Sequence, residues 1–203
     1  HTDSSAASDV YKRQALVVDT TAPTITSVTS TTNDGTYNET DTVNVTVTFS
    51  EAVTLDGGNL VITLETGDTD RTVTITEITS SNTASGTYTV QSGDTSSDLT
   101  ASGIALSAGT LKDAGGNAMS SFTIGSNLAA TSALVIDTTA PTVTGVDSST
   151  DAGTYIADQS ISIQVTFSET VNVTGTPQLT LETGGTDAVV DYASGSGSSV
   201  LTF

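Results

Sequence analysis

The chain repeats itself at the length of a whole domain. The segment A-L-V-V-D-T-T-A-P-T at residues 15–24 returns as A-L-V-I-D-T-T-A-P-T at residues 133–142, an offset of 118. The register then holds without a gap to residues 53 and 171, and 22 of the 39 aligned positions are identical. A period of this length is too long for a solenoid coil or a propeller blade, so it predicts tandem copies of one domain.

The repeat divides the sequence into four parts. Residues 1–14 are expected to be a non-native leader, because residues 4–14 (S-S-A-A-S-D-V-Y-K-R-Q) resemble the translation of a sequencing-library adapter. The leader contains no apolar run of the kind that a secretory signal needs. Residues 15–22 are expected to hold the last strand of a preceding repeat plus a linker, and residues 23–140 one complete repeat. Residues 141–203 are expected to form a truncated repeat that lacks everything after about its fourth strand.

The composition is strongly acidic. Four Lys and Arg residues stand against 23 Asp and Glu residues, which gives a formal net charge of −19. Nucleic acid and anionic lipid bind to clustered Lys and Arg, so the charge excludes both as ordinary partners and favours cations or a salty medium. The sequence has no cysteine, and therefore neither a disulfide nor a thiolate metal site. No apolar run approaches the roughly 18 residues that a membrane helix requires.

Apolar and polar side chains alternate along the expected strands. The clearest case is residues 42–49, where every second side chain is apolar: Val43, Val45, Val47 and Phe49. The second repeat has the same pattern at Ile161, Ile163, Val165 and Phe167. One apolar face and one polar face are typical of an antiparallel sheet that covers a core on one side. Further strands are predicted at Thr24–Thr29, Leu60–Leu64, Thr72–Ile78, Thr87–Val90, Gly103–Leu106, Phe122–Ile124 and Ala133–Ile136.

Turn sequences rich in Gly, Asn and Asp separate these strands. About seven or eight short strands in roughly 115 residues are typical of an immunoglobulin-like sandwich. The predicted fold class is therefore all-β, with tandem immunoglobulin-like Greek-key β-sandwich domains of which the second is truncated. This prediction depends on pattern alone, because the chain lacks the Cys pair and the Trp of antibody domains.

Three short motifs occur in a fixed order along the repeat: A-P-T-I-T-S-V, T-V-T-F-S-E-A-V and L-K-D-A-G-G-N-A, with V-D-T-T-A-P at each junction. Together they resemble the bacterial Ig-like repeats of very large secreted and cell-surface proteins of the adhesin type. The resemblance covers residues 15–203. It implies a sandwich used as a stalk or adhesive segment, located outside the cell or on the bacterial cell surface, with neighbouring repeats as its partners. It does not imply an enzymatic activity.

The residues needed for most catalytic sites are missing. Histidine and cysteine are both absent from residues 15–203, which excludes Ser–His–Asp and Cys–His nucleophiles and histidine-bound zinc. A pair of carboxylates of the glycosidase kind stays open, but most acids lie in turns or at polar strand positions, where surface charge is the simpler explanation. We expect no catalysis.

Calcium is the one ligand that the sequence suggests. Calcium binds six to eight hard oxygens, and carboxylates cluster with Gly and Asn in the expected loops. The candidate ligands are the junction acids and the acids and amide of two loops: Asp19, Asp137, Glu51, Glu169, Asp113 and Asn117. A cation at Asp137, in the expected hinge between domains, would stiffen the array, with a dissociation constant of roughly 10⁻⁴–10⁻³ M. The alternative is that Asp137 caps a turn and that Glu51 is simply solvated.

Three functions remain open from the sequence. The first is a non-enzymatic spacer in a large bacterial surface protein, because tandem domains with short Pro-containing linkers project length. The second is a module that binds a glycan or a partner protein through its loops. The absence of Trp and the small number of Tyr leave few rings for stacking on a sugar. The third is an accessory domain of an enzyme.

Overall fold

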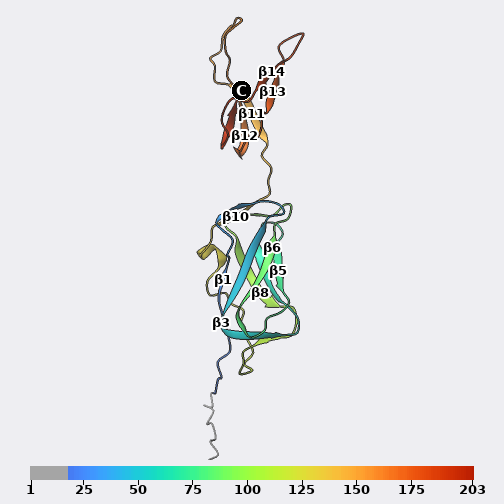
Figure 1. Ribbon diagram of the computed structural model, residues 1–203, viewed down its shortest axis with the longest axis vertical. Helices are drawn as coiled ribbons and strands as arrows, with labels where there is room; N and C mark the ends of the chain where they lie inside the picture. Colours follow the sequence, from blue (N-terminus) through green and yellow to red (C-terminus); the bar gives the residue numbers. More distant parts are fainter. Residues whose placement is uncertain (1–17) are drawn as a thin grey trace, which may run out of the picture. The chain divides into compact units, whose positions relative to one another are not determined.

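The computed structural model describes residues 18–203, and β-strands are the predominant regular structure of these residues (Figure 1). They form two compact units, of which the first ends at Thr138 and the second runs from Thr139 to Phe203. Fifteen strands and one short 3₁₀ helix lie in the described residues, and no α-helix. The all-β prediction is confirmed. The leader expected at residues 1–14, and residues 15–17 of the strand expected before the first complete repeat, lie outside the described part of the chain.

The first unit contains ten strands in three sheets. Their bounds are β1 Ile25–Thr29, β2 Gly35–Tyr37, β3 Thr42–Asp56, β4 Leu60–Glu65, β5 Arg71–Ile75, β6 Ser81–Thr89, β7 Thr95–Ser96, β8 Thr100–Leu106, β9 Thr110–Lys112 and β10 Leu134–Asp137. One sheet has the order β1-β3-β6, with β9 on the far end of β3, and a second has the order β5-β4-β8. In the third, β10 pairs in parallel with β2 and antiparallel with β7.

Strand β3 joins two regions of the unit. Its first half pairs antiparallel with β1 and β6, and its end, beyond an irregularity between Thr48 and Val53, pairs with β9. Figure 1 shows that the end of β3 turns aside from the main run of the strand. The 3₁₀ helix η1, Leu128–Ala130, lies on the outside of the unit and inserts Leu128 into the core.

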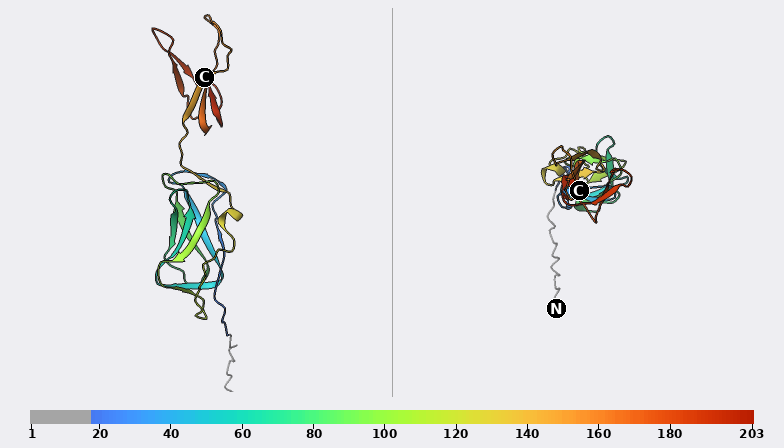
Figure 2. Two further views of the ribbon diagram at one scale, coloured as in Figure 1. Left: turned by 180° about the vertical axis from the view of Figure 1, so that it is seen from behind. Right: turned by 90° about the horizontal axis from the view of Figure 1, so that it is seen from above.

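The core of the first unit lies between the sheet of β3 and the sheet of β4. The alternation in residues 42–49 is confirmed, since the four apolar side chains of this stretch are at most 3% exposed. Leu60, Ile62 and Leu64 on β4 are fully buried in the same cluster. Figures 1 and 2, which view the unit from opposite sides, show strands of both sheets along this core. Each buried side chain of this kind contributes about 1.5–3 kcal/mol to folding, so these two alternating strands are a main source of stability.

One predicted strand is wrong. Residues 122–124 belong to no strand, and Phe122 and Ile124 pack half-buried against the core from an irregular segment. Three strands of the first unit were not predicted, namely β2, β7 and β9, and each has only two or three residues. Strands this short contain too few residues for alternation to identify them.

The second unit contains five strands: β11 Val143–Ser148, β12 Ile163–Val171, β13 Gln178–Leu181, β14 Ala188–Asp191 and β15 Ser198–Thr202. They form a sheet of order β11-β12-β15 and a separate β13-β14 pair. The β11–β12 ladder repeats the β1–β3 ladder at the 118-residue offset, with Val143 opposite Phe167 as Ile25 is opposite Phe49. The register shift after this first pair is repeated as well.

Candidate metal centre

Three carboxylates from distant parts of the first unit meet at one place. Asp19 precedes β1, Glu51 lies in β3 and Asp113 follows β9, and each offers an oxygen within 4.8 Å of the other two. Asp19 is exposed, Glu51 is half-buried and Asp113 is only 6% exposed. We call these three residues the carboxylate cluster. Hard oxygens brought together in this way are the ligands that calcium prefers.

The irregularity in β3 sets the position of Glu51. The pairing of β3 with β6 is interrupted between Thr48 and Val53, so this stretch leaves the regular ladder. An irregularity of this kind bends the strand, and the alternation of exposure continues through it, with Ser50 and Ala52 exposed and Val53 buried. The neighbouring Ser50 fastens the stretch to the start of the repeat, because its N–H donates to the carbonyl of Thr24 at 2.9 Å and its hydroxyl accepts from the Thr24 N–H at 3.0 Å.

The D-A-G-G-N loop sets the position of Asp113. The two carboxylate oxygens of Asp113 accept the backbone N–H and the side-chain Nδ2 of Asn117, both at 2.8 Å. The loop is closed by the Asp113 N–H, which donates to the Asn117 carbonyl at 3.2 Å, and Gly116 adopts a φ of 90°. That left-handed conformation explains the glycine at this position. The predicted turn therefore also orders one member of the carboxylate cluster.

Asn117 connects this loop to the segment before β1. Its Nδ2 also donates to the backbone carbonyl of Asp19 at 3.2 Å. The carboxylate of Asp19 in turn accepts the N–H of Thr21 at 2.9 Å, which fixes the local turn. A Cβ placed on Gly115 would lie 3.5 Å from the Cβ of Asp19, so the loop passes close to the segment at that point. The incoming segment is thus held by the same loop that provides Asp113.

The electrostatics of the cluster are unfavourable for three ionised carboxylates. Partial burial, followed by the charges of Asp113 and Asp19, raises the pKa of Glu51 above its usual value. Hydrogen bonds from the Asn117 side chain and from the backbone N–H groups of the loop lower the pKa of Asp113, despite its burial. A cation bound here would relieve the repulsion that Glu51 experiences, because an opposite charge favours the ionised carboxylate.

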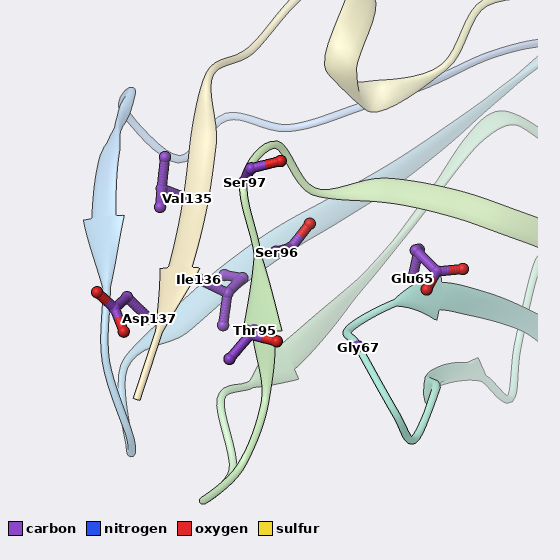
Figure 3. Close-up of a pocket in the computed structure, with 8 residues that line it drawn as sticks. All are labelled: Glu65, Gly67, Thr95, Ser96, Ser97, Val135, Ile136 and Asp137. Carbon is purple, nitrogen blue, oxygen red and sulfur yellow. The ribbon is translucent and has the colours of Figure 1, made fainter. Parts of the chain in front are cut away.

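Asp137 and Glu169, the repeat equivalents of Asp19 and Glu51, lie outside the carboxylate cluster. Asp137 was expected in a hinge between domains, but it is the last residue of β10 and lies opposite Thr95 of β7. With Glu65 and others it lines a groove, and Figure 3 shows the two acids on opposite sides of β7. Glu169 lies in β12 of the second unit and is half-buried. Of the six predicted ligands, four are brought together: Asp19, Glu51, Asp113 and Asn117.

A second polar group, which the sequence did not single out, is buried in the first unit. Asp94 is 1% exposed and accepts hydrogen bonds from the Tyr88 hydroxyl at 2.6 Å, Arg71 Nε at 2.7 Å and the Gln91 N–H at 2.9 Å. Burial alone would raise the pKa of Asp94, but these hydrogen bonds and the Arg71 charge outweigh it and lower the pKa. The sequence did offer a signal for this group, because Arg71 is one of only two basic residues after residue 14 and so stood out as a partner for an acid.

The same group holds the segment that leaves the first unit. The hydroxyl of Thr138 donates to the backbone carbonyl of Asp94 at 2.9 Å and accepts the N–H of Gly93 at 3.1 Å. Asp94 therefore ties β5, β6 and the residue after β10 together. The segments on both sides of the unit are fixed by side-chain hydrogen bonds, the incoming one through Asn117 and the outgoing one through Thr138.

Comparison with known proteins identified no relative of this chain: no protein-family model, no curated protein sequence and no solved structure matches it. Among residues 18–203, no helix has the length and apolar character needed to cross a membrane.

Proposed function

We propose that this chain is a structural spacer, an Ig-like tandem repeat of a large bacterial cell-surface or secreted adhesin, whose incoming linker is stiffened by calcium. The observation that carries the proposal is the carboxylate cluster, because Asp19 in the linker lies within 4.8 Å of two acids fixed to the body of the repeat. A cation shared by these three residues would bind the linker to the unit. The function is mechanical, and no reaction is part of it.

The architecture of the chain supports this role. A repeat of 118 residues gives units large enough to bury their own core, and in such arrays each unit contacts mainly its neighbours. Length is then added one unit at a time, and the stiffness of each linker decides how far the array extends. A linker held by hydrogen bonds and a cation samples fewer conformations than a free one, so the array would stay extended.

The donor set fits calcium. Each carboxylate offers one or both of its oxygens, so three carboxylates provide roughly half or more of the six to eight oxygens that calcium requires, and water supplies the rest. Calcium tolerates irregular geometry and exposed sites, whereas magnesium demands a near-ideal octahedron. The exposure of Asp19 is consistent with weak binding, with a dissociation constant of roughly 10⁻⁴–10⁻³ M, as in other extracellular modules.

The test is a calcium titration of the full chain after removal of divalent ions with EDTA. At a calcium concentration tenfold above the dissociation constant, we expect the melting temperature of the first unit to rise by about 5 °C. Hydrogen exchange of the loop at residues 113–117 should slow at the same concentrations. Asp113→Asn should abolish both responses, whereas Asp68→Asn, which removes the same charge from an exposed turn, should leave them intact.

Equal responses in the two variants would mean that calcium acts on overall charge and would contradict a site at the cluster. A glycan array with the calcium-loaded chain separates the spacer from the binding module. Specific glycan binding would favour the module, and a calcium response without glycan binding would favour the spacer.

A further inference from the structure

Three stretches of the chain have the pattern N-x-S/T, the acceptor sequence for an N-linked sugar. They begin at Asn38, Asn44 and Asn172. The pattern requires the amide of the asparagine, which receives the sugar, and a hydroxyl two residues later. A bulky sugar fits only where the asparagine lies on the surface and its amide is not used by the fold. The structure therefore decides which of these asparagines is a usable acceptor.

The stretch that begins at Asn44 is used by the fold. Asn44 lies inside β3, opposite Thr87 of β6, and is half-buried. Its Oδ1 accepts the hydroxyl of Thr46 at 2.9 Å, and the same hydroxyl lies 2.8 Å from the hydroxyl of Ser85. The amide and the hydroxyl of this stretch are thus both engaged within the sheet. Asn172, directly after β12, is exposed.

The stretch that begins at Asn38 lies in an exposed turn between β2 and β3. The backbone of this turn is held firmly. Asp41 donates its N–H to the Asn38 carbonyl at 3.1 Å and accepts the Asn38 N–H on its carboxylate at 2.9 Å. The N–H of Thr40 donates to the Val90 carbonyl at 3.0 Å. Within residues 18–203, no hydrogen bond occupies the side-chain amide of Asn38 or the hydroxyl of Thr40. Both groups that the acceptor pattern requires are therefore available at the surface.

The fold itself does not favour threonine at position 40. Thr40 has a φ of 76°, a left-handed conformation that β-branched residues rarely adopt. The second repeat forms the same turn, in which the N–H of Ile156 donates to the Gln159 side chain at 2.9 Å. The equivalent of Thr40 there is Asp158, with a φ of 69°, and aspartate tolerates this conformation better. The first repeat thus carries a strained residue at the one position of the turn where the acceptor pattern requires a hydroxyl.

We propose that the turn at residues 38–40 is a modification site, with Asn38 as the acceptor of a hexose from a nucleotide-diphosphate sugar. In the transfer, C1 of the hexose forms a bond to Nδ2 of Asn38, and the bond between C1 and the phosphate oxygen of the donor breaks. The nucleoside diphosphate leaves with that electron pair, and Nδ2 gives up one proton. The product carries a solubilising group on an exposed turn of the first unit.

The test incubates the folded full chain, carrying Asn172→Gln, with UDP-glucose and a soluble N-glycosyltransferase, and locates the glucose by peptide mass spectrometry. A synthetic peptide of residues 34–50 is treated in parallel and reports the preference of the enzyme between the two unfolded sequences. We expect glucose on Asn38 of the folded chain. We expect the ratio of Asn38 to Asn44 occupancy to be at least about tenfold higher in the chain than in the peptide, because Asn44 is reached only when β3 opens.

Two variants of Thr40 separate the hydroxyl from the conformation. Thr40→Ser keeps the hydroxyl and should keep the modification. Thr40→Gly removes the hydroxyl and should abolish the modification, but glycine adopts the left-handed conformation without strain, so the melting temperature of the variant should be no lower than that of the parent.

Three results would overturn the proposal: no glucose on Asn38 of the folded chain, the same occupancy ratio in the chain and the peptide, or a Thr40→Gly variant that melts clearly below the parent. The last result would show that the fold itself selects Thr40. None of these measurements involves calcium, so a failure here is distinct from a failure of the proposed spacer function.

Discussion

Replacing Asp94 by alanine is the strongest single test of how the first unit is held together. The substitution removes a carboxylate that accepts from Tyr88, Arg71 and the Gln91 N–H. The loss of the Asp94 acceptor does not cost the same at each of the three donors. Gln91 is exposed and the Arg71 side chain is 25% exposed, so water can replace part of what they lose. Tyr88 is 2% exposed, and its hydroxyl would be left buried without an acceptor.

The magnitude follows from these exposures. Leaving a buried donor unsatisfied costs about 1–3 kcal/mol, and removing one member of a buried ion pair costs about 3–5 kcal/mol. Because water reaches Arg71, we expect the low end of the second range, about 3 kcal/mol in the free energy of unfolding. This corresponds to a fall in melting temperature of roughly 10–15 °C for a unit of this size. Tyr88→Phe removes one neutral donor and should cost about 1 kcal/mol.

Urea denaturation of the full chain, followed by circular dichroism at pH 7, measures these differences as shifts of the midpoint at constant slope. The double variant of Asp94 and Tyr88 should show a coupling energy of about 1–2 kcal/mol. Asp98→Ala, four residues along the chain and exposed, is the matched control and should stay within about 0.5 kcal/mol of the parent. A cost below about 1 kcal/mol for Asp94→Ala, or no coupling with Tyr88, would refute the importance assigned to this group.

Three further predictions concern the first unit. The lowered pKa of Asp94 contributes stability that is complete above the unfolded-state value of about 3.9 and is lost as the pH falls through the folded-state value. Acid titration should therefore destabilise the parent below about pH 4, and Asp94→Ala should show a shallower dependence. Glu51 has a raised pKa, so its contribution is complete below about pH 4.3 and is lost as the pH rises through the folded-state value. At pH 7, the Glu51→Gln variant should thus melt at a higher temperature than the parent in EDTA and at a lower temperature than the parent in saturating calcium. A change of the same sign in both media would contradict the site. Gly58 has a φ of 65°, and a Cβ there would lie 2.2 Å from the Ala108 carbonyl oxygen, whereas Gly93, at a φ of 87°, has open space. By urea denaturation, Gly93→Ala should lower the free energy of unfolding by about 1–2 kcal/mol and Gly58→Ala by clearly more. Equal losses would show that the close approach of Ala108 to Gly58 does not constrain the turn at Gly58.

The candidate ligands of the carboxylate cluster could be predicted in part because some of their geometry is local. The D-A-G-G-N pattern places Asp113 and Asn117 four residues apart in a tight loop, and the structure closes that loop by their mutual hydrogen bonds. Asp19 and Glu51 were predicted for their chemistry, but their meeting with Asp113 depends on which loops lie at one end of the unit. The same chemical argument selected Asp137, and the tertiary structure places it at the end of β10 instead.

The sequence by itself determined the all-β class, the 118-residue repeat and the buried face of the long strands. These properties depend on residues close together in the chain, since alternation assigns every second side chain of a strand to one face. Only the tertiary structure decided that Glu51 leaves the ladder at a bulge and meets Asp19, that Asp94 is buried beside Arg71, and that Phe122 packs from an irregular segment. Each of these outcomes depends on contacts between segments far apart in sequence, where packing and backbone hydrogen bonding override the local pattern.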